Sequence, residues 1–373
     1  MASDAEQRTP ERPEVMLGDH PSPVDRFIAE HIEPRYDDLH SWPHKYSHIY
    51  LLYRAARRKK IRMKKITESQ RVLFHSGVAV GGVEEGVTSL VSHQARRVCR
   101  SKALTKRYLR ASGLPTPAGK VLHQSQYNAA VRYWEKLGRV ATVRPSRGDS
   151  GGGVTVGVRF EGDLREAWQK AIRSLPESAP EGSGSADQQI IVEESKEGLD
   201  LRTFVVGEAV VSAVVRVPFY VVGDGVSSVG ELADAEAARR PEGSYLADRT
   251  PEISEELLSE AGLSRAFVPP HGKIQHLTPL ADVAHGGALF VDVKEQLTEE
   301  VRQLAVDGLW AIPGLEAAAV DLLTPSLSSR QDALVMEVSP DASVTDFRYP
   351  DYGKYRQPQD FLMEQVLRHA PAQ

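Results

Sequence analysis

Two short apolar segments late in the chain each carry one carboxylate. Asp321 lies between Val320 and Leu322, and Glu337 lies within the apolar run 335–338. Both segments have the pattern of strands, and two neighbouring strands could each turn a carboxylate toward one cleft. Carboxylate oxygens are ligands that Mg²⁺ takes beside nucleotide phosphates. The pattern therefore predicts a magnesium and phosphate site; the alternative is one edge carboxylate on each of two half-buried strands.

A glycine-rich run at residues 148–153 separates two segments, 140–143 and 154–158, that we expect to be strands. Its Gly-Asp-Ser-Gly-Gly string matches the sequence around the nucleophile of trypsin-like serine proteases. We reject that function, because those enzymes are paired β-barrels with disulfides, whereas this chain is rich in helical patterns and has one cysteine. A Walker loop would need a following Lys-Ser or Lys-Thr pair, which the sequence lacks. The run is interpreted as a loop whose backbone N–H groups close over phosphate oxygens, although surface hairpins collect glycine too.

Composition narrows the classes of function. A chain of 373 residues exceeds one ordinary hydrophobic core, so we expect two or three lobes. A net charge of -5 argues against nucleic acid as a partner of the whole molecule. Cys99 is the only cysteine, which excludes an internal disulfide and a cysteine-built zinc site and favours a cytoplasmic location. No uninterrupted stretch of about 18 apolar residues occurs, so we expect no membrane-spanning helix.

The first part of the chain divides into a tail and a lobe. Residues 1–21, rich in proline and charge, are predicted to form a flexible tail, and residues 22–100 an N-terminal lobe with a hairpin near 77–86. The basic residues between positions 54 and 65 are interpreted as the solvated surface of a helix end and an edge strand. The alternative is a surface for an anionic ligand or RNA. The basic run contains Arg57, Arg58, Lys59, Lys60, Arg62, Lys64 and Lys65.

Two later lobes should carry the site. A central lobe, residues 101–189, begins with a helix near 102–112 that Gly113 and Pro115 stop. A C-terminal lobe, residues 190–373, mixes strands with a helix, which is an α+β pattern. Its strands are expected at 190–194, 202–206, 209–217, 317–323 and 333–338, and its helix at 299–309.

Taken in order, these segments resemble the ATP-grasp carboxylate–amine ligases, particularly the modules of cyanophycin synthetase and bifunctional glutathione synthetase. The resemblance covers roughly residues 46–370, and no single segment carries it alone. It implies an α+β ATP-grasp fold, in which a nucleotide is held between two α+β lobes, with an N-terminal α/β pre-ATP-grasp lobe. The matching segments are 102–117, 143–158, 191–206, 216–218, 223–225, 286–292 and 321–340.

The resemblance also implies roles for individual residues. Nucleotide contacts fall to Lys102, Arg144, Ser150, Gly151, Gly152, Glu193, Glu194 and Asp200, catalytic roles to Arg202, Arg216, Gly286 and Gly287, and metal binding to Asp321, Glu337 and Ser339. For the lysine and the arginines, surface or structural ion pairs are the alternative. Arg144 stands where the family has lysine, but arginine keeps the charge and can grip phosphate with two N–H groups. Ser339 stands where the family has asparagine; because a hydroxyl is a weaker magnesium ligand, Asp341 is an alternative ligand.

The implied function is a ligase that uses ATP and magnesium. ATP phosphorylates a substrate carboxylate, and the amine of a second substrate attacks the acyl phosphate to form an amide, with release of ADP and phosphate. Two Mg²⁺ ions are expected, which Mn²⁺ could replace. An amino acid or peptide is expected on each side, as in a free-standing dipeptide or γ-glutamyl ligase of specialised metabolism, and a homodimer is a further expectation. The alternative is a catalytically impaired ATP-grasp protein that binds nucleotide and regulates a partner.

Overall fold

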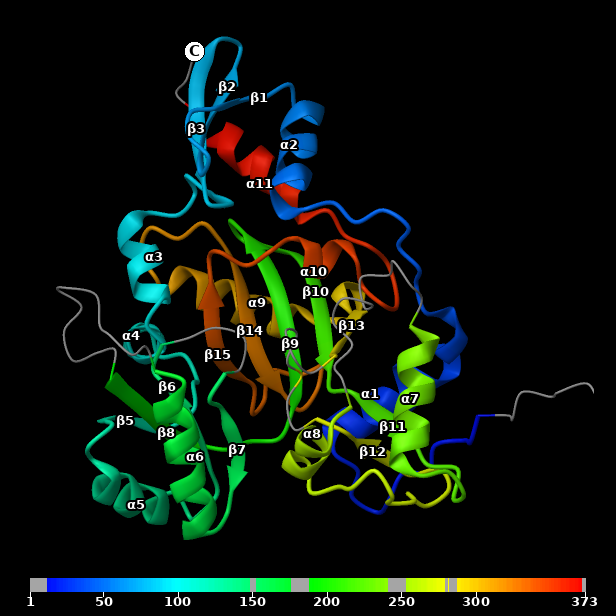
Figure 1. The fold of residues 1–373 in the computed structure, drawn as a ribbon. Coiled ribbons are helices and arrows are strands. Elements are labelled where there is room, and N and C mark those ends of the chain that lie inside the picture. Colours follow the sequence, from blue (N-terminus) through cyan, green and yellow to red (C-terminus); the bar gives the residue numbers. More distant parts are fainter. Residues whose placement is uncertain are drawn as a thin grey trace, which may run out of the picture.

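The computed structural model describes residues 12–147, 152–175, 188–240, 253–278, 281 and 287–370. Within these residues, helices and antiparallel sheets form the lobes that Figure 1 colours from blue to red along the chain. No helix among them is both long and apolar enough to cross a membrane.

The first lobe is an antiparallel sheet with two helices packed against it. Its elements are α2 (His48–Arg58), β1 (Arg62–Lys65), β2 (Gln70–His75), β3 (Val78–Glu84), β4 (Val87–Thr88) and, from the far end of the chain, α11 (Pro358–Arg368). Leu52 of α2, Leu73 of β2 and Met363 of α11 share one core. The expected hairpin near 77–86 is confirmed. The described strands of this lobe pair antiparallel in chain order, whereas an α/β lobe would pair them in parallel.

The central lobe is built on a four-stranded sheet of order β5–β8–β6–β7. Its elements, with the helix that leads into it, are α3 (His93–Cys99), α4 (Lys102–Ala111), β5 (Gly119–His123), α5 (Tyr127–Lys136), β6 (Ala141–Pro145), β7 (Thr155–Val158), α6 (Glu161–Arg173) and β8 (Gln189–Glu194). Trp134 of α5 and Trp168 of α6 are buried against one face of the sheet. Because β8 lies between β5 and β6, it belongs to this lobe, and the boundary that we placed at residue 190 moves to the end of β8.

The C-terminal lobe contains a five-stranded sheet of order β13–β10–β9–β14–β15. Its elements are β9 (Leu199–Val206), β10 (Ala209–Val217), β13 (Leu289–Asp292), η4 (Lys294–Gln296), α9 (Glu299–Trp310), β14 (Ala317–Thr324), β15 (Leu334–Ser339) and α10 (Thr345–Arg348). Leu304 of α9 packs in the core on one face, and Phe347 of α10 packs beside Phe204 on the other. Burial on both faces explains why β10 is apolar along most of its length. The predicted strands and the helix near 299–309 are confirmed.

A smaller unit is inserted between β10 and β13. It contains β11 (Tyr220–Val222), α7 (Val229–Arg239), α8 (Glu255–Glu260) and β12 (Ile274–His276). Strand β11 pairs with β12 in an antiparallel ribbon. Phe219, Leu258 and Leu277 form a separate small core under this ribbon. The unit therefore packs as a satellite of the C-terminal lobe.

The N-terminal segment packs against this inserted unit. It contains α1 (Pro23–His31) and the 3₁₀ helix η1 (Glu33–Asp38). Arg12 makes a bidentate ion pair with Glu33: its Nε and Nη2 donate to the two carboxylate oxygens at 2.7 and 2.9 Å. The guanidinium carbons of Arg12 and of Arg239 on α7 lie 3.4 and 3.7 Å from the centroid of the Tyr36 ring. These contacts hold Arg12 against η1, and the flexible tail over residues 1–21 stays a prediction.

Candidate active site

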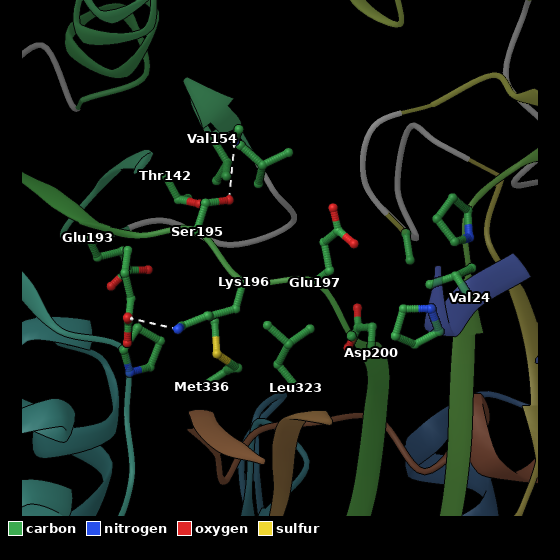
Figure 2. A pocket seen from close by; sticks show the side chains of 18 of the residues that line it. Val24, Thr142, Val154, Glu193, Ser195, Lys196, Glu197, Asp200, Leu323 and Met336 are labelled. Atoms are coloured by element: carbon green, nitrogen blue, oxygen red, sulfur yellow. Dashed lines mark hydrogen bonds and ion pairs between the residues drawn. The ribbon is translucent and has the colours of Figure 1, made fainter. Parts of the chain in front are cut away.

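A cavity of about 620 Å³ opens between the central and C-terminal lobes. Figure 2 shows the chain from Glu193 to Asp200 crossing it, with Met336 and Leu323 beside Lys196. Apolar and charged side chains from both sheets make its walls. Of the residues predicted from the sequence, those that line the cavity are Arg144, Glu193, Glu194, Asp200, Arg216, Asp321 and Glu337.

The two predicted metal carboxylates lie opposite each other on neighbouring strands. Asp321 of β14 pairs in register with Glu337 of β15, and the register shifts directly after Asp321. Lys102 Nζ lies 3.4 Å from both carboxylate oxygens of Glu337. The Ser339 hydroxyl donates to Glu337 at 3.3 Å. Strand pairing thus brings the three predicted metal ligands together, and Lys102 at the start of α4 contacts Glu337.

Two arginines on neighbouring strands hold Asp321. Arg202 of β9 lies opposite Asp321 in register, and its Nη1 donates to both carboxylate oxygens, at 3.0 and 2.7 Å. Arg216 of β10 donates from Nη2 to Asp321 at 3.0 Å and to Asp200 at 2.6 Å. Burial by itself would lower the pKa of Arg216, but the two carboxylates raise that pKa overall. A further carboxylate, Asp346, was not predicted as a site residue and lies 3.8 Å from Arg202 Nε.

A second ion cluster lies on the central-lobe side of the cavity. The Glu193 carboxylate, 1% exposed, binds Lys106 of α4 and lies 3.0 Å from Arg144 Nε. Burial lowers the pKa of Lys106 to about 8, although Glu193 acts to raise it. Arg144 Nη2 has no hydrogen-bond partner among the described residues, which leaves a buried cationic donor for an anion. Lys106 was not predicted as a site residue. It lies one helical turn after Lys102, and this spacing was the one sign in the sequence that both lysines share a helix face.

Apolar side chains line the middle part of the cavity. Val154 directly precedes β7 of the central lobe, and Met336 and Leu323 come from the C-terminal sheet (Figure 2). A slot with apolar sides and polar backbone nearby suits a flat heterocycle. Met336 was not predicted as a cavity residue. An apolar residue next to Glu337 in a strand could as well pack in a core.

The remaining predicted residues lie behind the cavity wall or away from it. Gly152 is exposed, and the carbonyl of the buried Gly287 accepts from Arg240 Nη1 at 3.0 Å. Neither glycine is among the described residues that line the cavity. The others are Lys102, Arg202 and Ser339, which stand behind the wall, and Ser150, Gly151 and Gly286, for which the predictions lie outside the described residues.

The carboxylates fit a metal ion that is shared with a ligand. In the described part of the chain, no group of three His, Cys, Asp or Glu side chains is placed to hold an ion. Mg²⁺ is commonly held by one or two carboxylates together with phosphate oxygens of the substrate. Asp321 and Glu337 match that arrangement. Their partners in the structure are the cations Arg202, Arg216 and Lys102, whose positive charge balances the two carboxylates.

Comparison with known proteins finds relatives that share part of this sequence. No family model matches the sequence. The cyanophycin synthetase of Nostoc sp. (strain PCC 7120) is 32% identical over 250 residues, which make up 64% of this chain and 26% of the relative. The glutathione biosynthesis bifunctional protein of Pasteurella multocida is 29% identical over 253 residues, 65% of this chain and 31% of the relative. The chain thus spans about a quarter to a third of the length of these curated relatives.

A solved structure shares the fold. The crystal structure of a bifunctional glutathione synthetase from Pasteurella multocida covers 86% of this chain, with a TM-score of 0.57 and 23% sequence identity. The match takes up 44% of that chain. The predicted resemblance and the predicted fold class are both confirmed.

Proposed function

We propose that this chain, which has the ATP-grasp fold and is related to ATP-dependent carboxylate–amine ligases, joins a carboxylate to an amine through an acyl phosphate. One observation carries the proposal: Asp321 and Glu337, paired in register, line the same cavity as Arg144 of the other lobe. A nucleotide bound between the lobes would meet the carboxylates on one side and the cation on the other. This is the arrangement that phosphoryl transfer requires.

Cations of the central lobe would bind the phosphates. Arg144 lines the cavity, and its Nη2 has no hydrogen-bond partner among the described residues; Lys102 would reach the terminal phosphates beside Glu337 from behind the cavity wall. The Glu193 carboxylate orients Arg144 from behind. Magnesium bound at Asp321 and Glu337 would neutralise charge on the phosphates as the terminal phosphoryl group moves.

The reaction is a phosphoryl transfer followed by amide formation. An oxygen of the donor carboxylate forms a bond to the γ-phosphorus while the bond from phosphorus to ADP breaks. The acceptor nitrogen then bonds to the acyl carbon, loses a proton and expels orthophosphate, which keeps one oxygen of the donor. Arg216, and Arg202 behind it, would stabilise the oxygens of the acyl phosphate and of the tetrahedral intermediate.

The substrates are proposed to be amino acids or peptides. We place the adenine base in the slot between Val154 and Met336, beside the segment that crosses the cavity. One relative is named for the biosynthesis of glutathione, which is a peptide, and this supports an amino acid or peptide at both the donor and the acceptor positions.

The test follows the phosphates and the oxygen of the donor carboxylate. The full chain is incubated with ATP, Mg²⁺ and a mixture of amino acids whose carboxylates carry heavy oxygen. We expect ADP and orthophosphate, with one labelled oxygen in orthophosphate for each amide formed. Stoichiometric AMP and pyrophosphate, or unlabelled orthophosphate during amide formation, would overturn the proposal. Mass spectrometry of the amide identifies the two substrates.

A further inference from the structure

Helix α2 of the first lobe has an unusual outer face. Its inner face packs around Leu52 in the core. Two residues of the outer face are large rings that remain 42% and 39% exposed. The outer face carries a row at the helical spacing i, i+3, i+4, i+7, which we call the α2 stripe: Tyr50, Tyr53, Arg54 and Arg57.

The cations near the stripe form two sets with different partners. Arg58 lies 2.5 Å from Asp360, and Lys59 pairs with Glu364, so this set binds α2 to α11 and holds the lobe together. The second set is exposed and makes no ion pair with a carboxylate of the described residues. Its members are Arg54, Arg57, Lys60, Arg62 and Lys64. The stability of the lobe therefore does not account for the second set.

Aromatic contacts hold the stripe in one arrangement. The ring centroids of Tyr46 and Tyr50 are 4.8 Å apart, and those of Tyr50 and Tyr53 are 6.3 Å apart. The guanidinium carbon of Arg54 lies 5.2 Å from the Tyr46 centroid, and that of Arg57 lies 6.0 Å from the Tyr53 centroid. Side chains that already support one another lose less freedom on binding. Tyrosine and arginine are also the residue types that supply most binding energy at protein interfaces.

We propose that the α2 stripe, with Lys60, Arg62 and Lys64, binds a carboxylate-rich segment of a partner polypeptide. Guanidinium groups pair with carboxylates through two hydrogen bonds, and the exposed rings would cover the apolar stems of the same segment. The stripe is only about 10 Å long, which suits a short peptide segment. A long nucleic acid would also meet a molecule of net charge -5 beyond the stripe.

This surface is independent of the proposed ligase reaction. Figure 1 shows α2, β1–β3 and α11 at the opposite end of the molecule from β5–β8, the sheet of the central lobe. The residues of the stripe are not among those that line the cavity. A variant of the stripe should therefore bind nucleotide as the parent does, which separates this proposal from the previous one.

The test measures fluorescence anisotropy of a labelled peptide in which glutamate alternates with alanine, titrated with the full chain. We expect Arg54→Glu combined with Arg57→Glu to weaken binding on the order of tenfold or more, and Tyr50→Ala with Tyr53→Ala to weaken it too. The control is Arg139→Glu with Arg165→Glu, two arginines that, unlike those of the stripe, each lie near a carboxylate, Glu135 at 3.7 Å and Glu161 at 3.9 Å. These arginines are also exposed, and each lies within 6 Å of an aromatic ring, at 5.8 and 5.5 Å, in the central lobe. The control should bind the peptide as the parent does.

Three results would overturn the proposal. The first is a parent chain that does not bind the glutamate peptide more tightly than a glutamine–alanine peptide. The second is equal weakening in the stripe variant and the control variant, which would show general charge attraction only. The third is tighter binding of a single-stranded oligonucleotide of the same charge, lost in the stripe variant alone, which would make the stripe a nucleic-acid surface. Circular dichroism of each variant checks that the chain is folded.

Discussion

Glu337 is the carboxylate on which the proposed chemistry depends most. We expect Glu337→Ala to lower the rate of ADP release on the order of 10² or more, because a main charge-stabilising group is lost. The fold should stay intact, since the side chain is 29% exposed and fills no core. The measurement is ADP release at saturating Mg²⁺, with the thermal unfolding midpoint as control. Activity within about tenfold of the parent would contradict the metal assignment.

Ser339 is the weakest member of the carboxylate cluster. Its hydroxyl donates to Glu337 in the structure, so it lies beside the proposed metal carboxylate but offers no amide oxygen. We expect Ser339→Asn to lower the Mg²⁺ concentration for half-maximal rate, because an amide oxygen is the better magnesium ligand. A titration of rate against Mg²⁺ checks this. An unchanged or higher half-maximal concentration would shift the role to another group, with Asp341 the first candidate.

The buried Lys106 makes stability depend on pH. Its pKa falls from 10.5 in the unfolded chain to about 8 in the folded chain. Between these values the unfolded chain binds the extra proton, so the free energy of unfolding should rise with pH, at most by roughly 1.4 kcal/mol per pH unit. Below pH 8 the cost of burying the charge is fully present. Urea unfolding from pH 7 to 10.5 should show this slope in the parent and not in Lys106→Met; equal slopes would refute the assignment.

At the scale of elements, the β11–β12 ribbon depends on a close backbone approach at Gly223. Gly223 N–H donates to Lys273 O at 2.9 Å, which continues the pairing of the two strands. A methyl group there would lie 2.3 Å from Pro270 O and 2.6 Å from Pro269 O, and backbone oxygens cannot move aside freely. We expect Gly223→Ala to destabilise the protein by about 1–3 kcal/mol, measured by urea unfolding.

Helix α6 offers the matched control for that substitution. A methyl group on Gly162 meets nothing within 4 Å. Because alanine favours a helix over glycine, Gly162→Ala should be neutral or stabilising by up to about 1 kcal/mol. If Gly223→Ala were as stable as Gly162→Ala, the ribbon would not be as closely packed as the structure has it.

At the scale of the whole molecule, the cavity takes its walls from two lobes, so a ligand should stabilise both. With Mg²⁺ and a non-hydrolysable ATP analogue at 100 times its Kd, we expect a stabilisation of about 2.7 kcal/mol. Hydrogen exchange should slow in β8 of the central lobe and in β15 of the C-terminal lobe. Protection of one lobe alone would contradict a nucleotide held between them.

Local sequence patterns determined most of the elements and much of the site. The strands around Asp321 and Glu337 and the helix near 299–309 could be predicted because apolar spacing reports which face of an element is buried. The same short segments carried the site residues, so motif order was enough to predict that Arg144, Asp200, Arg216 and the two carboxylates proposed for the metal would line one cavity.

Only the tertiary structure decided which elements become neighbours. Strand β8 was recognised as a strand, but its pairing with β5 and β6 depends on hydrogen bonds between segments far apart in the chain. For the same reason the sequence could place Lys106 one helical turn after Lys102 but could not predict its contact with Glu193, nor the packing of Tyr36 against Arg12 and Arg239. A residue's own neighbours set its conformation and its buried face, whereas its partner across a cavity is set by how the whole chain buries its apolar surface.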